Sequence, residues 1–260
     1  MTKRKKRILN IVPVVSNKWN AAWKETLEKY ASPEFILDFR NVEYGGTESI
    51  EGLYYIAVTV PYIVDEIIQA EKEGYDAVTS LCFGNPGVSE SRELVKIPVV
   101  GAGEAALYVA MMCGDRLAII GMGGTYRTRQ HGAMLRLIRN MIIPWGISDR
   151  IVYYGTTGFP VEDCTAIEKI LEALERESQK AMEAGAEVIV LGCTGMTGLA
   201  VKLQKKLDIP VVDPGVSALK FAELLVTMNL THSRLTIPSP DLCGVKCVMK
   251  WPPTLRQYPR

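Results

Sequence analysis

The stretch Glu187–Gly198 reads EVIVLGCTGMTG, and it decides the fold. Four apolar residues, Val188–Leu191, run directly into Gly192, and Cys193 follows. A short apolar run that ends at a glycine is typical of a strand buried on both faces of a parallel sheet. The Gly-Cys-Thr-Gly sequence predicts a tight turn from strand to helix. This turn places one thiol at the carboxyl end of the strand, where open α/β sheets bind ligands.

The same arrangement occurs earlier in the chain. Asp76–Gly84 reads DAVTSLCFG, an apolar strand that runs into Cys82. Each copy is followed by a helical stretch and then by Ile-Pro-Val-Val, at Ile97–Val100 and at Ile209–Val212. The spacing from cysteine to proline is nearly the same in both copies, so the chain contains an internal repeat. The repeat predicts two related halves whose thiols face each other across one cleft.

Strands alternate with helices in both halves, which predicts parallel sheets joined by right-handed crossovers. We therefore expect an α/β fold with two lobes, each a roughly four-stranded parallel sheet flanked by helices. The first lobe is expected at residues 1–105 and the second at 106–214. A helix at 215–230 is expected to return and complete the first lobe, and residues 231–260 to form a proline-rich tail.

Three segments carry more specific expectations. Leu53–Glu73 has the pattern of a long helix, but Pro61 inside it should kink or split the helix. Glu162–Ala184 is predicted as one long helix. Asn41–Ile50 contains two adjacent glycines and is predicted to be a loop that could cover a site.

Composition and charge exclude several classes of protein. Hydrophobic residues make up 48% of the 260 residues and charged residues 23%, which is ordinary for a soluble protein. The net charge of +1 argues against a nucleic-acid-binding protein. No signal peptide is visible, and no apolar segment approaches the length of a membrane-spanning helix. We expect a cytoplasmic protein whose six scattered cysteines are free thiols, with no membrane partner.

Two of the cysteines stand apart from the others. A single cysteine is most often a small buried hydrophobic residue. Four are interpreted in this way: Cys113, Cys164, Cys243 and Cys247. Cys82 and Cys193 differ, because each ends an apolar strand, each precedes residues that open a helix, and both occupy equivalent places in the repeat. A helix N-terminus favours negative charge, so we expect it to lower the pKa of each thiol below the free value of about 8.5.

Two equivalent thiols suit one kind of chemistry. Moving a proton from one face of a carbon to the other requires a base on one face and an acid on the opposite face. If one thiol is ionised and the other protonated, the pair works in both directions and exchanges states in each turnover. Backbone N–H groups at the turns after Cys82 and Cys193 can stabilise the developing enolate. This two-base mechanism requires no cofactor.

Further motifs accompany the two cysteine turns. They are Gly46–Glu51, Cys82–Gly87, Arg92–Leu94, Ile97–Gly101 with Glu104–Ala106, and Leu191–Met196. By these motifs the chain resembles the aspartate/glutamate/hydantoin racemase superfamily, and within it the hydantoin and allantoin racemase branch, over most of residues 8–228. The resemblance implies two lobes related by a pseudo-twofold axis, a site in the cleft between them, and a cysteine acid–base pair at Cys82 and Cys193. It also implies a homo-oligomer.

The resemblance implies further site residues. Carboxylate or imide groups of the substrate are expected to be held by backbone amides and small polar residues at the strand ends. These are Phe83, Gly84, Thr194 and Gly195, together with Ser16, Asn17 and Thr125. One loop departs from the family pattern, because a polar turn of the Asn-Pro-Asn-Thr type is replaced by the more apolar Val12–Asn17, with Trp19 close behind. This departure leaves the identity of the substrate open.

Several functions are compatible with these residues. The first is a cofactor-independent racemase that inverts a carbon next to a carbonyl, such as C5 of a substituted hydantoin or related cyclic ureide. A second group keeps the fold and changes the reaction: an amino-acid or dicarboxylate racemase, a cis–trans isomerase, or a decarboxylase. Two cysteines argue against the decarboxylase, which uses a single one. The third is a small-molecule binding protein without activity.

Other motifs have simpler interpretations. Gly121–Gly124 follows a strand, but the third glycine of a dinucleotide-binding fingerprint is missing at the required spacing. Cys243 and Cys247 lack matching partners, so we predict no metal site. Glu104 opens a helix, where a carboxylate is favourable on electrostatic grounds alone. His232, at the start of the tail, is predicted to have no role in catalysis.

Overall fold

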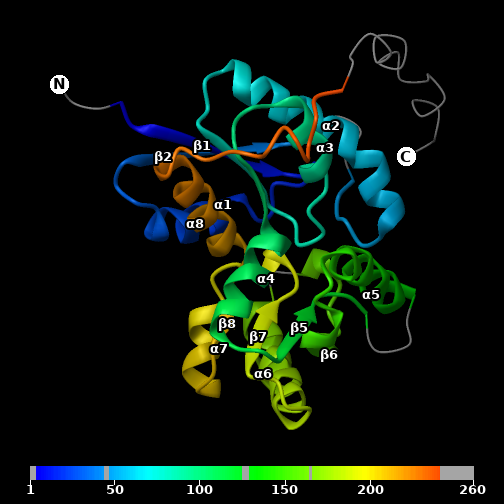
Figure 1. Ribbon diagram of the computed structural model, residues 1–260. Coiled ribbons are helices and arrows are strands. Elements are labelled where there is room, and N and C mark those ends of the chain that lie inside the picture. Colours follow the sequence, from blue (N-terminus) through cyan, green and yellow to red (C-terminus); the bar gives the residue numbers. More distant parts are fainter. Residues whose placement is uncertain (1–3, 44–46, 125–128, 164–165, 241–260) are drawn as a thin grey trace.

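Two four-stranded parallel sheets organise the chain. The computed structural model describes residues 4–43, 47–124, 129–163 and 166–240 (Figure 1). One sheet has the strand order β2-β1-β3-β4 and the other the order β6-β5-β7-β8. Every strand pairing in both sheets is parallel. The predicted α/β fold with two four-stranded parallel sheets is therefore confirmed, and the matching strand orders are the structural form of the internal repeat.

The elements of the first half alternate between strand and helix. In chain order they are β1 (Lys6–Val12), α1 (Asn20–Tyr30), β2 (Phe35–Asn41), α2 (Leu53–Lys72), β3 (Ala77–Ser80), α3 (Val88–Leu94), β4 (Val99–Gly101) and α4 (Ala102–Cys113). All four residues of β3 are buried, as expected for a parallel strand covered by helices on both faces.

The second half repeats the alternation. Its elements are β5 (Leu117–Gly121), α5 (Arg129–Ile142), β6 (Ile151–Thr156), α6 (Ile167–Glu183), β7 (Val188–Leu191), α7 (Ala200–Leu207), β8 (Val211–Val212) and α8 (Pro214–Thr227). Short 3-10 helices lie at Ile143–Trp145, Ser148–Arg150, Val161–Asp163 and Thr194–Met196. β7 is also buried along its whole length, so the two strands that precede the cysteines have equivalent surroundings.

Helix α8 follows the last strand of the second sheet but packs on the first half of the chain. Figure 1 shows it beside α1. Its carboxylate Glu223 accepts hydrogen bonds from the backbone N–H and the hydroxyl of Ser32, both at 2.8 Å. Asp213 caps the start of the helix by accepting from the N–H groups of Gly215 and Val216. Helix α8 therefore follows the second half in the chain but packs with the first half.

Two predicted helices differ in the structure. Helix α2 is not split at Pro61, because tertiary packing of its buried face, including Ile63 and Ile67, outweighs the loss of one backbone hydrogen bond, and the alternative of a kink stays a prediction. The predicted helix Glu162–Ala184 is instead the short 3-10 turn Val161–Asp163 and the separate helix α6. Cys113 is also different from its interpretation as a buried residue, since it is exposed at the end of α4.

The described part of the tail lies along the first sheet's helix α3 and strand β4. Arg234 donates to the carbonyl of Arg92 at 2.9 Å and also to that of Val95, so a cation satisfies carbonyl groups at the end of α3. Thr231 donates to the Lys96 carbonyl at 2.5 Å. Within the described ranges, no helix combines the length and apolar character needed to cross a membrane.

Candidate active site

Cys82 and Cys193 line one pocket between the ends of the two sheets. Each cysteine lies two residues beyond the last residue of its strand, β3 or β7. The cavity volume of the pocket is about 50 Å³, and the space between its lining atoms, with the open solvent at its mouth, is about 530 Å³. Its described lining residues are Pro13, Val14, Trp19, Trp23, Ser49, Ile50, Leu81, Cys82, Phe83, Gly84, Met134, Leu137, Val161, Gly192, Cys193, Thr194 and Gly195.

Thr194 joins the two cysteine turns directly. Its hydroxyl donates to the carbonyl of Leu81 at 2.9 Å, so the residue after one cysteine bonds to the residue before the other. The carbonyl of Thr194 accepts from the indole N–H of Trp23 at 2.7 Å. Both hydrogen bonds are buried, where leaving one partner unsatisfied costs about 1–3 kcal/mol. These contacts fix the relative position of the two thiols.

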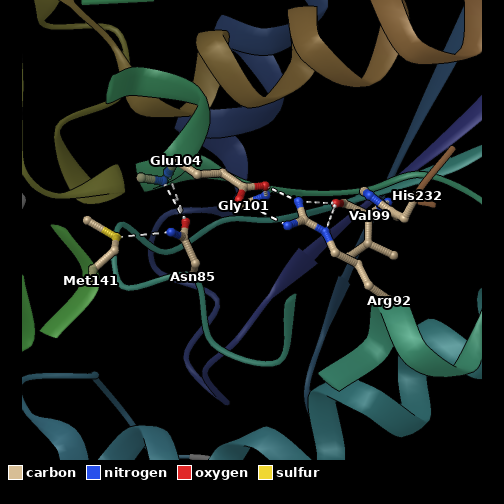
Figure 2. Close-up of polar contacts among 8 residues, drawn as sticks. Asn85, Arg92, Val99, Gly101, Glu104, Met141 and His232 are labelled. Atoms are coloured by element: carbon tan, nitrogen blue, oxygen red, sulfur yellow. Dashed lines mark hydrogen bonds and ion pairs between the residues drawn. The ribbon is translucent and has the colours of Figure 1, made fainter. Parts of the chain in front are cut away.

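The Cys82 turn is held from behind by Asn85, which has the left-handed backbone conformation (φ 52°). The Asn85 amide oxygen accepts from the N–H groups of Gly103 (2.8 Å) and Glu104 (3.2 Å), and so caps the start of α4 (Figure 2). Its amide nitrogen donates to the sulfur of Met141, on α5. Gly103 permits the close approach, because a side chain there would collide with the carbonyl oxygen of Phe83.

Glu104 belongs to this supporting structure. Its carboxylate accepts from the Gly101 N–H at 3.1 Å and pairs with Arg92, which also donates to the Val99 carbonyl at 2.8 Å (Figure 2). On the same strand, the Val99 N–H donates to Nε2 of His232 at 3.0 Å. Burial, together with the cations Arg92 and Arg234, lowers the pKa of His232 to about 4, so the ring is a neutral acceptor at neutral pH.

The surroundings of Cys82 oppose ionisation. Burial raises the pKa of its thiol to about 11, and the hydrogen bond from the Gly84 N–H offsets this only in part. The expectation of a lowered pKa is therefore wrong for Cys82, because burial outweighs the local hydrogen bond and helix α3 begins only at Val88, six residues after the cysteine. The Cys193 turn is arranged differently: a 3-10 helix begins at Thr194, and the Gly195 N–H donates to the Cys193 sulfur at 3.4 Å.

Backbone donors follow both cysteines at equivalent positions. Among the described residues, no acceptor is found for the backbone N–H of Phe83 or of Thr194. The residues before the cysteines are paired in matching ways: the Leu81 N–H donates to Ile11 on β1, and the Gly192 N–H donates to Ile120 on β5. The repeat therefore extends to individual hydrogen bonds and presents two backbone donors beside the two thiols.

The predicted site residues fall into three groups. Phe83, Gly84, Thr194 and Gly195 line the pocket with the cysteines. Ser16 and Asn17 are not among its lining residues, and Asn17 is exposed, so a role for them in substrate binding stays a prediction. Thr125 lies outside the described residues.

Sequence reasoning missed part of the pocket wall. Trp19 and Trp23 come from the start of α1, while Met134 and Leu137 come from one face of α5. The spacing of Met134 and Leu137 was a usable signal, because residues three apart share a helix face.

None of the described lining residues carries a formal charge, and no group of three or more His, Cys, Asp or Glu among the described residues is arranged to hold a metal ion.

Comparison with known proteins gives consistent results. Residues 21–222 match the family model described as Asp/Glu/Hydantoin racemase. A hydantoin racemase from Pseudomonas sp. (strain NS671) is 33% identical over 192 residues, which cover 73% of this chain and 74% of that protein. One from Paenarthrobacter aurescens is 31% identical over 235 residues, covering 88% and 94%. The structure of an allantoin racemase from Klebsiella pneumoniae has a TM-score of 0.80 at 28% identity, covering 91% of this chain and 94% of that one.

Proposed function

The chain belongs to the Asp/Glu/hydantoin racemase family and is an isomerase of the racemase type, and from this premise we propose that it inverts C5 of a 5-substituted hydantoin or a related cyclic ureide. The reaction needs no cofactor, and Cys82 and Cys193 are its acid–base pair. One observation carries the proposal: two thiols from equivalent points of the repeat line a single pocket.

The proposed reaction is a proton transfer at carbon. One sulfur, as thiolate, removes the proton from C5, and the electron pair of the C–H bond moves onto the adjacent carbonyl as an enolate. The other thiol then gives its proton to the opposite face, so the two sulfurs exchange protonation states. The N–H groups of Phe83 and Thr194 are the proposed donors for the enolate oxygen. The raised pKa of Cys82 supports its assignment as the protonated member of the resting pair.

The pocket wall supports a neutral substrate. A carboxylate moved out of water requires a paired charge or several hydrogen bonds, and the described lining residues offer no cation. Trp19, Trp23, Met134 and Leu137 instead offer apolar surface to a ring and its substituent. This favours a cyclic ureide with an apolar 5-substituent over the amino acids and dicarboxylates that other racemases of this fold would bind.

The experiment uses enantiomerically pure 5-benzylhydantoin in deuterated water. Wild-type protein should cause loss of optical rotation together with exchange of the C5 proton. Cys82→Ala and Cys193→Ala should each abolish racemisation, since a single thiol cannot serve both faces. Cys113→Ala is the matched control, because its thiol is exposed on α4, and it should retain wild-type activity. If Cys82→Ala or Cys193→Ala racemised the substrate at the wild-type rate, the two-base mechanism would be refuted.

A further inference from the structure

Trp19 carries a buried polar group that the mechanism above does not use. The side chain is 5% exposed and lines the pocket. Its indole N–H has no hydrogen-bond acceptor among the described residues. Native structures rarely leave a buried donor unpaired, because its lost hydration is not replaced. A donor in this position is available to a bound ligand.

The neighbouring tryptophan shows what a paired indole does here. Trp19 and Trp23 stack with their ring centroids 6.0 Å apart and their planes 16° from parallel. The Trp23 N–H donates to the Thr194 carbonyl and so ties α1 to the Cys193 turn. The two tryptophans at the start of α1 therefore differ. The indole N–H of Trp23 is bonded to the protein, whereas that of Trp19 is available to a molecule in the pocket.

The Trp19 indole nitrogen and the Cys193 sulfur lie close to the same point. A methyl group added to Gly195 would lie 3.3 Å from Nε1 of Trp19 and 3.4 Å from the Cys193 sulfur. Trp19, Cys193 and Gly195 all line the pocket, so the donor and the sulfur are neighbours on its wall. A substrate whose carbon contacts the sulfur can thus place an atom bonded next to that carbon against the indole N–H.

We propose that the Trp19 indole N–H donates a hydrogen bond to the carbonyl oxygen next to the inverted carbon, and stabilises the enolate that forms there. This inference rests on the proposed function and deepens it, because it assigns a catalytic donor. It selects substrates that carry a carbonyl acceptor adjacent to the acidic C–H. In a hydantoin this is the C4 carbonyl, since C4 is the carbonyl carbon bonded to C5.

The test removes the N–H and preserves the ring shape. Trp19 is replaced by 3-benzothienylalanine, an isostere with sulfur in place of the indole N–H, and separately by phenylalanine. We expect kcat for 5-benzylhydantoin to fall on the order of 10²-fold in both variants, as for other lost oxyanion donors, with a much smaller change in KM. The melting temperature of the isosteric variant should not decrease, because no protein hydrogen bond is lost.

Trp23→Phe is the matched control. It removes an N–H that is bonded to Thr194, so it should lower the melting temperature, which the isostere at Trp19 does not. The second arm weakens the acceptor by using the 4-thio analogue of the substrate, since sulfur accepts hydrogen bonds poorly. For the Trp19 variants, the ratio of wild-type kcat to variant kcat should be smaller with this analogue than with 5-benzylhydantoin.

The outcomes separate the two proposals. If the wild-type protein racemises 5-benzylhydantoin and the isosteric variant keeps its kcat, the Trp19 assignment is wrong and the proposed function stands. An equal loss of kcat on the oxygen and sulfur substrates would also overturn the assignment, because the effect would not pass through the carbonyl. If wild-type protein exchanges no C5 proton in any cyclic ureide, both proposals fail.

Discussion

The Cys82 turn and the Cys193 turn begin alike and end differently. Each thiol follows a buried parallel strand, and the residue before it donates to the neighbouring strand in the same way. After Cys82, Asn85 adopts the left-handed backbone conformation before α3 begins. After Cys193, a 3-10 helix begins at the next residue. Equivalent positions in a repeat therefore do not give the thiols equivalent surroundings.

The supports of the two turns also differ. Most of the bracing of the Cys82 turn comes from its own half, through Asn85 at the start of α4 and the Glu104–Arg92 pair behind it, with one contact from Asn85 to Met141 on α5. The Cys193 turn is held across the cleft, by the bonds of Thr194 to Leu81 and to Trp23. The comparison teaches that one repeated arrangement of strand and cysteine can be supported in two ways, so that each sulfur has its own surroundings.

The largest effect is expected from Gly103→Ala, which should break the Cys82 turn alone. The added methyl group collides with the Phe83 carbonyl, so the turn must shift away from α4. Overpacking of this kind costs about 1–3 kcal/mol of unfolding free energy, measurable by urea denaturation. Gly132→Ala on α5 is the control, because no atom lies within 4 Å of its added methyl, and it should be neutral or stabilising. Equal stability of the two variants would contradict the close contact.

Thr194→Val tests the link between the turns. The substitution keeps the shape of the side chain but leaves the Leu81 carbonyl without its donor, at a cost of about 1–3 kcal/mol in unfolding free energy. Thr194→Ser retains the hydroxyl and should recover most of that loss. Denaturation of the two variants side by side gives the comparison. A serine variant as unstable as the valine variant would place the loss in packing and not in the hydrogen bond.

Asn85→Ala should lower the free energy of unfolding by less than the two preceding variants. Its effect should be confined to the Cys82 turn. It removes a cap from α4, which is worth about 1 kcal/mol, and it removes the contact with Met141. Racemisation should slow, since the turn that carries Cys82 loses its brace, while Asn85→Asp, which keeps an acceptor for both N–H groups, should retain more activity. Unfolding free energy and kcat measured together check this.

The pH dependence should distinguish the thiols. Because burial raises the pKa of Cys82 to about 11, alkylation of Cys82 by iodoacetamide should stay slow through neutral pH and rise only toward pH 11. The raised pKa also contributes stability that is fully present below the free thiol's pKa and is lost as pH rises through about 11. Peptide mass spectrometry resolves the alkylation of each cysteine. Rapid modification of Cys82 at pH 7 would contradict its assignment as the protonated thiol.

A separate pH effect is expected at the tail. The lowered pKa of His232 means that the unfolded chain binds its proton first, so the stability from this contact is present above the free pKa of about 6.5 and is lost as pH falls through about 4. His232→Gln retains an acceptor for the Val99 N–H and does not titrate. The unfolding free energy of the wild type should fall relative to this variant between those pH values. Parallel curves would show that the histidine does not titrate in the folded state as assigned.

The sequence by itself determined the two buried strands, the repeat, and the position of one cysteine at the end of each strand. These features are local: an apolar run that ends in glycine and cysteine folds in the same way at Val188–Leu191 and at Ala77–Ser80. The resemblance to the racemase family implied Phe83, Gly84, Thr194 and Gly195, and the structure places all four on the pocket wall.

Only the tertiary structure decided the rest. The protonation of Cys82 depends on atoms that surround it from other elements, and its burial reverses the shift that local helix geometry predicted. The bond between Thr194 and Leu81 joins residues 113 positions apart, and that between Trp23 and Thr194 joins residues 171 positions apart. The Trp19 indole N–H is unpaired because no described residue places an acceptor within hydrogen-bond distance of it. Such properties arise from distant segments meeting in space, and a one-dimensional pattern does not contain them.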